Sequence, residues 1–214
     1  KNYRKICYHL GLIVNKQGIR FLDEGENLRT YTYAQFGSRI LDQVDGIAYQ
    51  LFDAKVMDYL YEEYFFYDAH YEEAQTIEEL AFKIEGVNKD KLIETIRTFN
   101  AACGPANQID PSNLDGNCTK GLEIPKTNWA QRLDTPPFRA YPVTGGISFT
   151  YGGLKVSEKG EVLRPDSTPI TGLYACGEIV GGVFFGGYPG GAGLTAGAVF
   201  GRAAGYGAAG ALEG

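Results

Sequence analysis

The most informative stretch of this sequence is Gly172-Leu-Tyr-Ala-Cys-Gly-Glu-Ile-Val-Gly-Gly-Val183, which leads into Gly186-Gly-Tyr-Pro-Gly-Gly-Ala-Gly-Leu-Thr195. The first part is typical of a short buried strand, Leu173–Glu178, that ends in a glycine and a carboxylate. The second part leads into a helix expected over Gly193–Arg202, with small residues on one face. Glycines in this number let a flat ligand lie against the backbone, although a glycine-rich packing turn without a ligand would also fit.

Two chemical features of this stretch indicate what a ligand could be. Free N–H groups at a helix start, together with the helix dipole, favour negative charge, such as that of a reduced flavin around N1 and the C2 carbonyl. The Glu178 carboxylate at a strand end could accept hydrogen bonds from ribityl or sugar hydroxyls. Alternatively, Glu178 caps a loop amide.

The composition excludes several classes of protein. With 214 residues, 44% hydrophobic and 21% charged, the chain is neither disordered nor collagen-like. A net charge of −6 and a pI of about 5.0 argue against nucleic-acid binding. Four cysteines without a Cys-x-x-Cys pair, and only two histidines, predict no metal site. The cysteines are typical of reduced thiols, which predicts a cytoplasmic location.

The uncharged window Ile179–Gly201 is long enough to cross a bilayer. It contains nine glycines and Pro189 but few large aliphatic residues, so we predict no transmembrane segment. We also expect no signal peptide, because Lys1–Lys5 leads into a strand-like run rather than a long apolar region. Fourteen of the 29 glycines fall between Gly177 and the C-terminus, so the chain has two unlike parts.

Hydrophobic spacing gives a coarse series of elements before residue 65. It predicts strands at Leu10–Asn15 and Gly18–Leu22 around a turn, and a strand at Gly46–Phe52. It also predicts helices over Tyr33–Gln43 and Lys55–Tyr64.

Two further helices have clearer start signals. Thr76-Ile-Glu-Glu79 is a capping box, in which Thr76 accepts the N3 amide and Glu79 reaches back to the cap. A helix from about Lys89 to Ala102 carries an apolar stripe of Leu92, Ile93, Ile96 and Phe99. Twelve acidic and four basic residues between Asp53 and Glu94 indicate a solvated face or, alternatively, a docking patch.

Between Gly104 and Pro142, turn-forming residues around a lone Trp129 predict an irregular but well-anchored loop. Strand character returns over Gly145–Val156 and Glu161–Leu163. No internal repeat is present.

The order and separation of these motifs resemble a known arrangement. With Gly197-Ala-Val-Phe-Gly-Arg-Ala-Ala-Gly205, the glycine-rich segments resemble the C-terminal flavin segment of the fumarate reductase/succinate dehydrogenase flavoprotein family. Similar motifs are Thr150-Tyr-Gly-Gly-Leu-Lys-Val156 and Asn15-Lys-Gln-Gly-Ile-Arg-Phe-Leu-Asp-Glu24. A narrower likeness, to FAD-dependent tricarballylate dehydrogenases, is carried by Arg29–Ala34, Asn128–Phe138 and Tyr188–Gly191.

The resemblance implies an α+β fold: a flavoprotein capping domain plus the C-terminal strands and helix of a Rossmann-like FAD-binding domain. The expected parts are a strand pair entering the cap over residues 1–30, the capping domain over 31–140, and the FAD-binding segment over 141–214. In this family the FAD pyrophosphate is held by a Rossmann-type unit, in which Gly-x-Gly-x-x-Gly follows a strand and an acidic residue lies about 20 positions further on; no such unit is present in the sequence. The chain therefore resembles the C-terminal portion of a longer flavoprotein, inactive without the rest.

The resemblance also implies the roles of particular residues. FAD would be the cofactor of the full enzyme, held by Gly153, Gly177, Glu178, Gly191, Ala192, Gly193, Leu194 and Thr195. Phe149, Tyr151 and Tyr188 would line the substrate pocket, with Phe149 and Tyr151 alternating with Thr150 along a strand. Tyr188 and Arg29 are the catalytic candidates. Alternatively, Tyr188 is a packing aromatic beside the flavin, and Arg29 a surface residue.

At two positions the chain differs from fumarate reductases, and both differences affect which substrate is expected. Fumarate reductases keep a histidine where this chain has Phe149 and an arginine where it has Tyr188, so plain fumarate reduction is not expected. Tyr188-Pro-Gly190 is instead similar to the ketosteroid dehydrogenase branch, where the tyrosine hydrogen-bonds a substrate carbonyl. The expected reaction is hydride transfer between flavin N5 and a tricarballylate-like organic acid. A 3-ketosteroid-type dehydrogenase, a fumarate reductase-like fragment and a non-catalytic assembly module are the alternatives.

The resemblance has a consequence for partners. The segment from about Val143 normally packs on a sheet that the sequence lacks, which would leave an apolar patch exposed. We therefore expect either that the missing N-terminal portion or a second copy of the chain covers it, or that the chain is poorly ordered after about Gly177.

Overall fold

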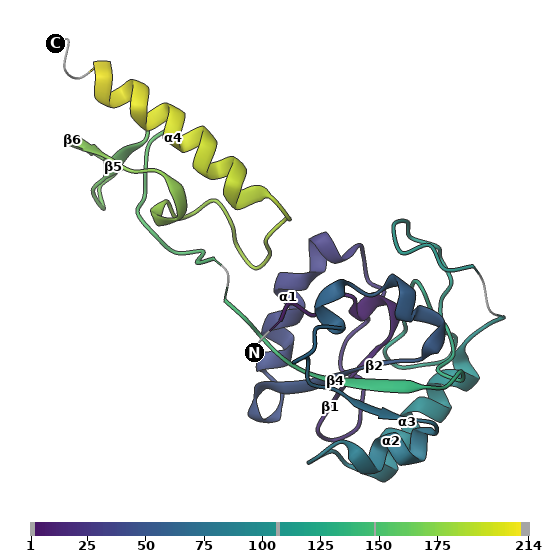
Figure 1. Ribbon diagram of the computed structural model, residues 1–214. Helices are drawn as coiled ribbons and strands as arrows, with labels where there is room; N and C mark the ends of the chain where they lie inside the picture. The colour runs from purple at the N-terminus through teal and green to yellow at the C-terminus, as the bar shows by residue number, and fades with distance from the viewer. Residues whose placement is uncertain (1–2, 106–107, 148, 211–214) are drawn as a thin grey trace. The chain divides into compact units, whose positions relative to one another are not determined.

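The computed structural model describes residues 3–105, 108–147 and 149–210. It divides the chain into two compact units, Lys1–Gly145 and Gly146–Gly214, each of which combines helices with strands (Figure 1). The expected mixed class of helices and strands is confirmed. In the described ranges, no helix has both the length and the apolar character that crossing a bilayer requires.

The first unit is built on an antiparallel sheet with the strand order β1-β2-β4-β3. The strands are β1 (Leu12–Asn15), β2 (Ile47–Phe52), β3 (Glu72–Ala74) and β4 (Phe138–Thr144). β2 pairs with β4 along its whole length, so the sheet joins the first fifty or so residues of the unit to its last residues through backbone hydrogen bonds.

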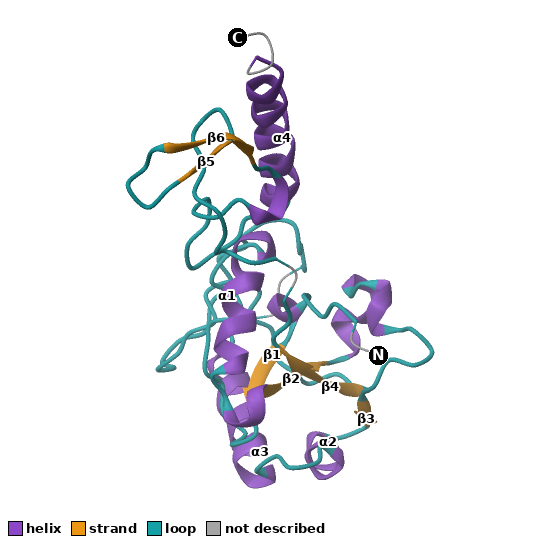
Figure 2. Ribbon diagram, turned by 90° about the vertical axis from the view of Figure 1, so that its left-hand side faces the viewer, coloured by secondary structure: helices purple, strands orange, loops and turns teal. Residues whose placement is uncertain are grey.

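Helices cover both faces of this sheet (Figure 2). They are α1 (Arg29–Leu41), α2 (Ile77–Lys83) and α3 (Lys89–Ala102). Because side chains alternate along a strand, Leu12 and Val14 share a core with α2 and α3, whereas Ile13 packs with α1. All of β1 is buried for this reason.

The predicted start of α2 is confirmed. The Thr76 Oγ1 accepts the Glu79 amide at 3.1 Å. The Glu79 carboxylate accepts the amide of Gln75, at 3.2 Å, rather than that of Thr76. In α3, Leu92, Ile96 and Phe99 are buried as predicted.

Two predictions for the first unit were wrong. Residues 55–64 form two 3-10 helices, Ala54–Tyr59 and Glu62–Tyr64, because aromatic residues there lower helix propensity. Gly18–Leu22 is not a strand, and only Arg20 forms a bridge, with Val14. The helix predicted over Tyr33–Gln43 is confirmed, with the bounds Arg29–Leu41.

The described residues between Cys103 and Pro137 form neither helix nor strand, as predicted. Buried Trp129 anchors this connection, with its indole Nε1 donating to the Asp110 carbonyl at 2.8 Å. The Lys126 Nζ, fully buried, donates to the Gly11 carbonyl at 2.6 Å. Burial lowers the pKa of Lys126 to about 8.

The loop predicted over Gly104–Pro142 was wrong at its C-terminal end, because the strand β4 begins at Phe138. Pro142 argues against a strand because it has no N–H for the ladder. On one side β4 pairs with β2, but on the other β3 extends only as far as Ala140. Pro142 therefore lies where no ladder bond is needed on that side.

The second unit holds a hairpin, β5 (Glu161–Leu163) with β6 (Pro169–Tyr174), and the helix α4 (Ala192–Gly210). The predicted helix is confirmed and is longer than expected.

Two strand predictions for the second unit were wrong. Within Gly145–Val156, Leu154 and Val156 form isolated bridges only, and Ser148 lies outside the described residues. The strand predicted to continue to Glu178 ends at Tyr174, and its Leu173 is exposed rather than buried. Tyr174, by contrast, packs against α4, where its hydroxyl donates to the Gly207 carbonyl at 2.9 Å.

Candidate functional site

Tyr188 lies within an aromatic cluster of the second unit and is only 7% exposed. The Phe149 ring stacks on it, with centroids 5.2 Å apart and planes 19° from parallel. Phe184 meets it edge-on at 5.0 Å. The structure thus brings together Phe149 and Tyr188, which the sequence analysis placed in one pocket. Tyr151 approaches Phe184, at 6.4 Å, rather than alternating along a strand.

The Tyr188 hydroxyl is held at the start of α4. It accepts the Gly193 N–H at 2.8 Å. A Cβ on Gly193 would lie 2.5 Å from that hydroxyl oxygen, so only glycine allows the contact. Accepting a hydrogen bond from an amide strengthens the same hydroxyl as a donor.

The prediction of free amides at the start of α4 is therefore partly wrong. The Gly193 amide is engaged by Tyr188, and the Ala192 amide donates to the Pro189 carbonyl at 3.1 Å. An anion at this helix start would meet fewer open donors than the sequence analysis assumed.

The Glu178 carboxylate follows β6 and caps a loop. Its Oε1 accepts the Thr150 amide at 3.0 Å and lies 3.5 Å from the Thr150 hydroxyl. This is the loop-capping alternative considered above. Because Glu178 is exposed and these contacts use one oxygen, they leave its ribityl-binding role a prediction.

Gly153 has a structural role that the sequence analysis missed. The backbone passes so close to Gly181 that a Cβ on Gly153 would lie 2.3 Å from the Ile179 carbonyl oxygen. The crossing is held by the Leu154 amide, which donates to Ile179 at 2.7 Å, and by the Gly181 amide, which donates to Leu154 at 3.0 Å.

We expect Gly153→Ala to destabilise this crossing by about 1 to 3 kcal/mol, because the new methyl group overlaps backbone atoms that cannot rotate away. Gly152→Ala is the matched control, since a Cβ there meets nothing within 4 Å. Hydrogen exchange at the Leu154 and Gly181 amides should accelerate in the first variant and stay unchanged in the second. Equal exchange in both variants would contradict the prediction.

Three of the eight residues predicted to hold the cofactor, Gly191, Ala192 and Thr195, line an open groove of about 460 Å³. It is lined by Val183, Phe184, Gly190, Gly191, Ala192, Thr195, Ala196, Val199 and Phe200. Gly177 and Gly191 have φ angles of 78° and 82°, and a Cβ on either would meet nothing within 4 Å. Their backbone is therefore open to a ligand, and this open glycine surface fits the edge of a flat cofactor.

Arg29, the other catalytic candidate, belongs to the first unit, at the first residue of α1. Its guanidinium carbon lies 4.7 Å from the centroid of the Tyr61 ring. Nothing in the sequence pointed to Tyr61, which is 32 positions away.

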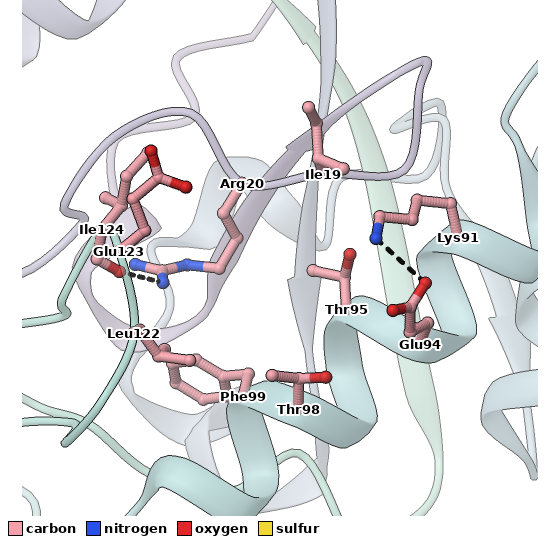
Figure 3. Close-up of a pocket in the computed structure, with 10 residues that line it drawn as sticks. All are labelled: Ile19, Arg20, Lys91, Glu94, Thr95, Thr98, Phe99, Leu122, Glu123 and Ile124. Atoms are coloured by element: carbon pink, nitrogen blue, oxygen red, sulfur yellow. Dashed lines mark hydrogen bonds and ion pairs between the residues drawn. The ribbon is translucent and has the colours of Figure 1, made fainter.

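A second cavity, of about 230 Å³, lies between α3 and the loop that contains Leu122–Ile124 (Figure 3). Three of its four charged side chains, those other than Glu123, already have partners. Arg20 pairs with Glu24 at 2.6 Å, and Lys91 pairs with Glu94 at 2.9 Å. None of the predicted site residues lines it.

Comparison with known proteins decides the family. A family model described as an FAD binding domain matches residues 6–194. This chain belongs to that family. FAD as the cofactor is thereby confirmed at the level of the family, as is membership among FAD-dependent oxidoreductases related to fumarate reductase.

The relatives of this family member are larger oxidoreductases. The chain is 34% identical over 201 residues to NADH:acrylate oxidoreductase of Vibrio harveyi, covering 91% of this chain and 18% of that protein. The fold matches an open flavocytochrome c3 fumarate reductase, with a TM-score of 0.67 and 27% identity over 98% of this chain and 34% of that one. It also matches 3-ketosteroid-Δ4-(5α)-dehydrogenase from Rhodococcus jostii RHA1, with a TM-score of 0.66 and 26% identity over 95% and 39%. The chain thus spans a fifth to two fifths of these proteins.

Proposed function

We propose that the protein containing this chain is an FAD-dependent dehydrogenase or reductase that acts on an organic acid of the tricarballylate type. The observation that carries this proposal is the Tyr188 hydroxyl, which the Gly193 amide holds within an aromatic cluster next to the glycine-lined groove. FAD, when bound, supplies hydride transfer at N5.

The chain's own residues would bind and orient. The open backbone of Gly177 and Gly191 supports binding of the cofactor, with Glu178 accepting hydrogen bonds from its hydroxyls. The other proposed cofactor contacts are Gly153, Ala192, Gly193, Leu194 and Thr195. Phe149 and Tyr151 would line the substrate pocket, where Tyr188 donates a hydrogen bond to a substrate oxygen. Arg29 would bind a carboxylate or move a proton.

A ketosteroid substrate is the second candidate. The stacked pair Phe149–Tyr188, with Phe184 against it, offers a flat apolar surface beside a hydroxyl donor. The likeness to a ketosteroid dehydrogenase structure favours the same substrate class.

We further propose that the second unit is part of a Rossmann-like FAD-binding domain whose remaining portion covers its apolar side chains. Ile147 and Leu194 are 88% and 82% exposed. Such side chains favour either that portion or self-association. The cysteines are all free, which is in keeping with a cytoplasmic location.

The test is anaerobic mixing of the complete flavoprotein with tricarballylate while the visible flavin absorbance is followed. We expect bleaching, because oxidation of the acid reduces the flavin. Bleaching only with a 3-ketosteroid would select the second candidate. A protein that binds FAD but responds to neither compound, or that binds no FAD, would contradict the proposed activity and favour a non-catalytic module.

A further inference from the structure

Two arginines of the first unit contact the same aromatic ring. The Arg29 guanidinium carbon lies 4.7 Å from the Tyr61 centroid, and that of Arg4 lies 5.2 Å from it. The two arginines are 25 positions apart in the sequence, so only folding makes them neighbours. The ring restrains both side chains, and this lowers the entropy that a ligand contact would cost.

The charges around this ring do not balance. Arg4 pairs with Glu63 at 3.0 Å. Among the residues that the structure describes, the Arg29 guanidinium has no carboxylate within ion-pair distance. Lys5 adds a third positive charge, with its Nζ donating to the Glu63 carbonyl and lying 4.7 Å from the Tyr64 centroid. Of these three cations, only Arg4 is ion-paired with a carboxylate among the described residues, although the chain as a whole has a net charge of −6.

Both arginines also act electrostatically on the buried thiol of Cys7. Burial raises the pKa of Cys7, while the positive charges of Arg29 and Arg4 act in the opposite direction. This agrees with the ring contacts in placing the two guanidinium groups on one small region of the first unit.

In the described part of the second unit, no two basic side chains contact one ring. Lys155 donates to the Ser167 hydroxyl at 2.7 Å, and Arg164 donates to the Pro169 carbonyl at the same distance. Arg202 lies over the ring of Tyr206.

We propose that Arg4, Tyr61 and Arg29 form a carboxylate-binding subsite, in which a carboxylate of a di- or tricarboxylic acid binds the two guanidinium groups. The inference rests on the proposed function for its ligand and adds Arg4 and Tyr61 to Arg29. Guanidinium groups match carboxylates geometrically, and both of these lie close to the same ring. Tyr61 is a positioning residue, because it acts through the arginines.

The test measures binding apart from turnover. Isothermal titration of tricarballylate into the FAD-loaded complete flavoprotein gives the Kd, and flavin bleaching gives the activity. We expect Arg4→Gln to raise the Kd at least about tenfold at low salt, with a smaller effect at high salt. We expect Tyr61→Leu to raise the Kd by a smaller factor, since it removes the restraint but keeps both charges.

Arg97→Gln is the matched control. Arg97, like Arg4, is an exposed arginine of the first unit with one glutamate partner, with side chains 70% and 61% exposed. Its replacement should change the Kd by less than about twofold. An equal Kd in the wild type and Arg4→Gln would overturn the subsite, whatever the activity. Binding that depends on Arg4 without flavin bleaching would support the subsite and overturn the proposed reaction.

Discussion

Replacing Tyr188 by phenylalanine should lower the turnover of the complete flavoprotein by about 10²- to 10³-fold, with its flavin content unchanged. The phenylalanine ring preserves the stacking on Phe149 and the edge contact with Phe184. It removes only the hydroxyl, which accepts the Gly193 amide at 2.8 Å and is the proposed donor to the substrate. Single-turnover flavin reduction with saturating substrate is the measurement.

Tyr206→Phe provides the matched control for this variant. Tyr206 belongs to the same helix, α4, and its ring is 70% exposed and in contact with Arg202. Its rate should stay within about twofold of the wild type, as surface substitutions usually do. If Tyr188→Phe loses flavin as well as activity, the hydroxyl serves to cap α4 rather than to contact the substrate. A full rate in Tyr188→Phe would contradict the catalytic role.

His9 should make the first unit sensitive to acid. It is buried against Trp129, with ring centroids 4.9 Å apart, and in the described residues neither ring nitrogen has a hydrogen-bond partner. Burial lowers the pKa of His9 to about 3, and the positive charges of Lys126 and Arg29 act in the same direction. A protonated imidazole is therefore unfavourable in the folded state.

The direction of the pH effect follows from this lowered pKa. The unfolded chain takes up the proton near pH 6.5, whereas the folded chain does so only near pH 3. Stability is therefore complete above about pH 6.5 and falls as the pH drops toward 3. Between pH 7 and pH 4 the loss due to His9 should be about 3 kcal/mol.

The measurement is urea unfolding of the 214-residue chain at both pH values, with Trp129, its single tryptophan, as the fluorescent probe. Carboxylates also titrate in this range, so the informative quantity is the difference between the wild type and His9→Leu. We expect His9→Leu to lose about 3 kcal/mol less than the wild type over this interval. His70→Leu replaces the other histidine, which is exposed, and should match the wild type. Equal losses in the wild type and His9→Leu would contradict the prediction.

Local patterns in the sequence predicted the elements that local physics determines. The capping box at Thr76, the apolar stripe of α3 and the helix after the glycine run depend on neighbours within one or two turns. The strand at 138–144 was missed because the tolerance of Pro142 depends on how far β3 extends. The chain between Lys55 and Tyr64 has apolar spacing that suits a helix, but it forms 3-10 turns.

For the site, the sequence predicted the members but not their contacts. Phe149, Tyr188 and Gly193 were all singled out, and they are in contact. That Gly193 donates to the tyrosine hydroxyl could not be predicted, because it depends on the path of the intervening Pro189–Ala192 turn. Arg4 and Tyr61 carried no sequence signal, because no motif includes them.

The sequence by itself determined the family, the cofactor class and the glycines that let the backbone come close to another group. Such glycines are local requirements, since a Cβ is either tolerated or not. Only the tertiary structure decided which charged groups lie close together and which groups are buried. It brought Arg4 and Arg29 to one ring, left His9 without a polar partner among the described residues, and set Gly153 against Gly181. Electrostatic balance and burial depend on distances in space, and separation along the chain does not encode them.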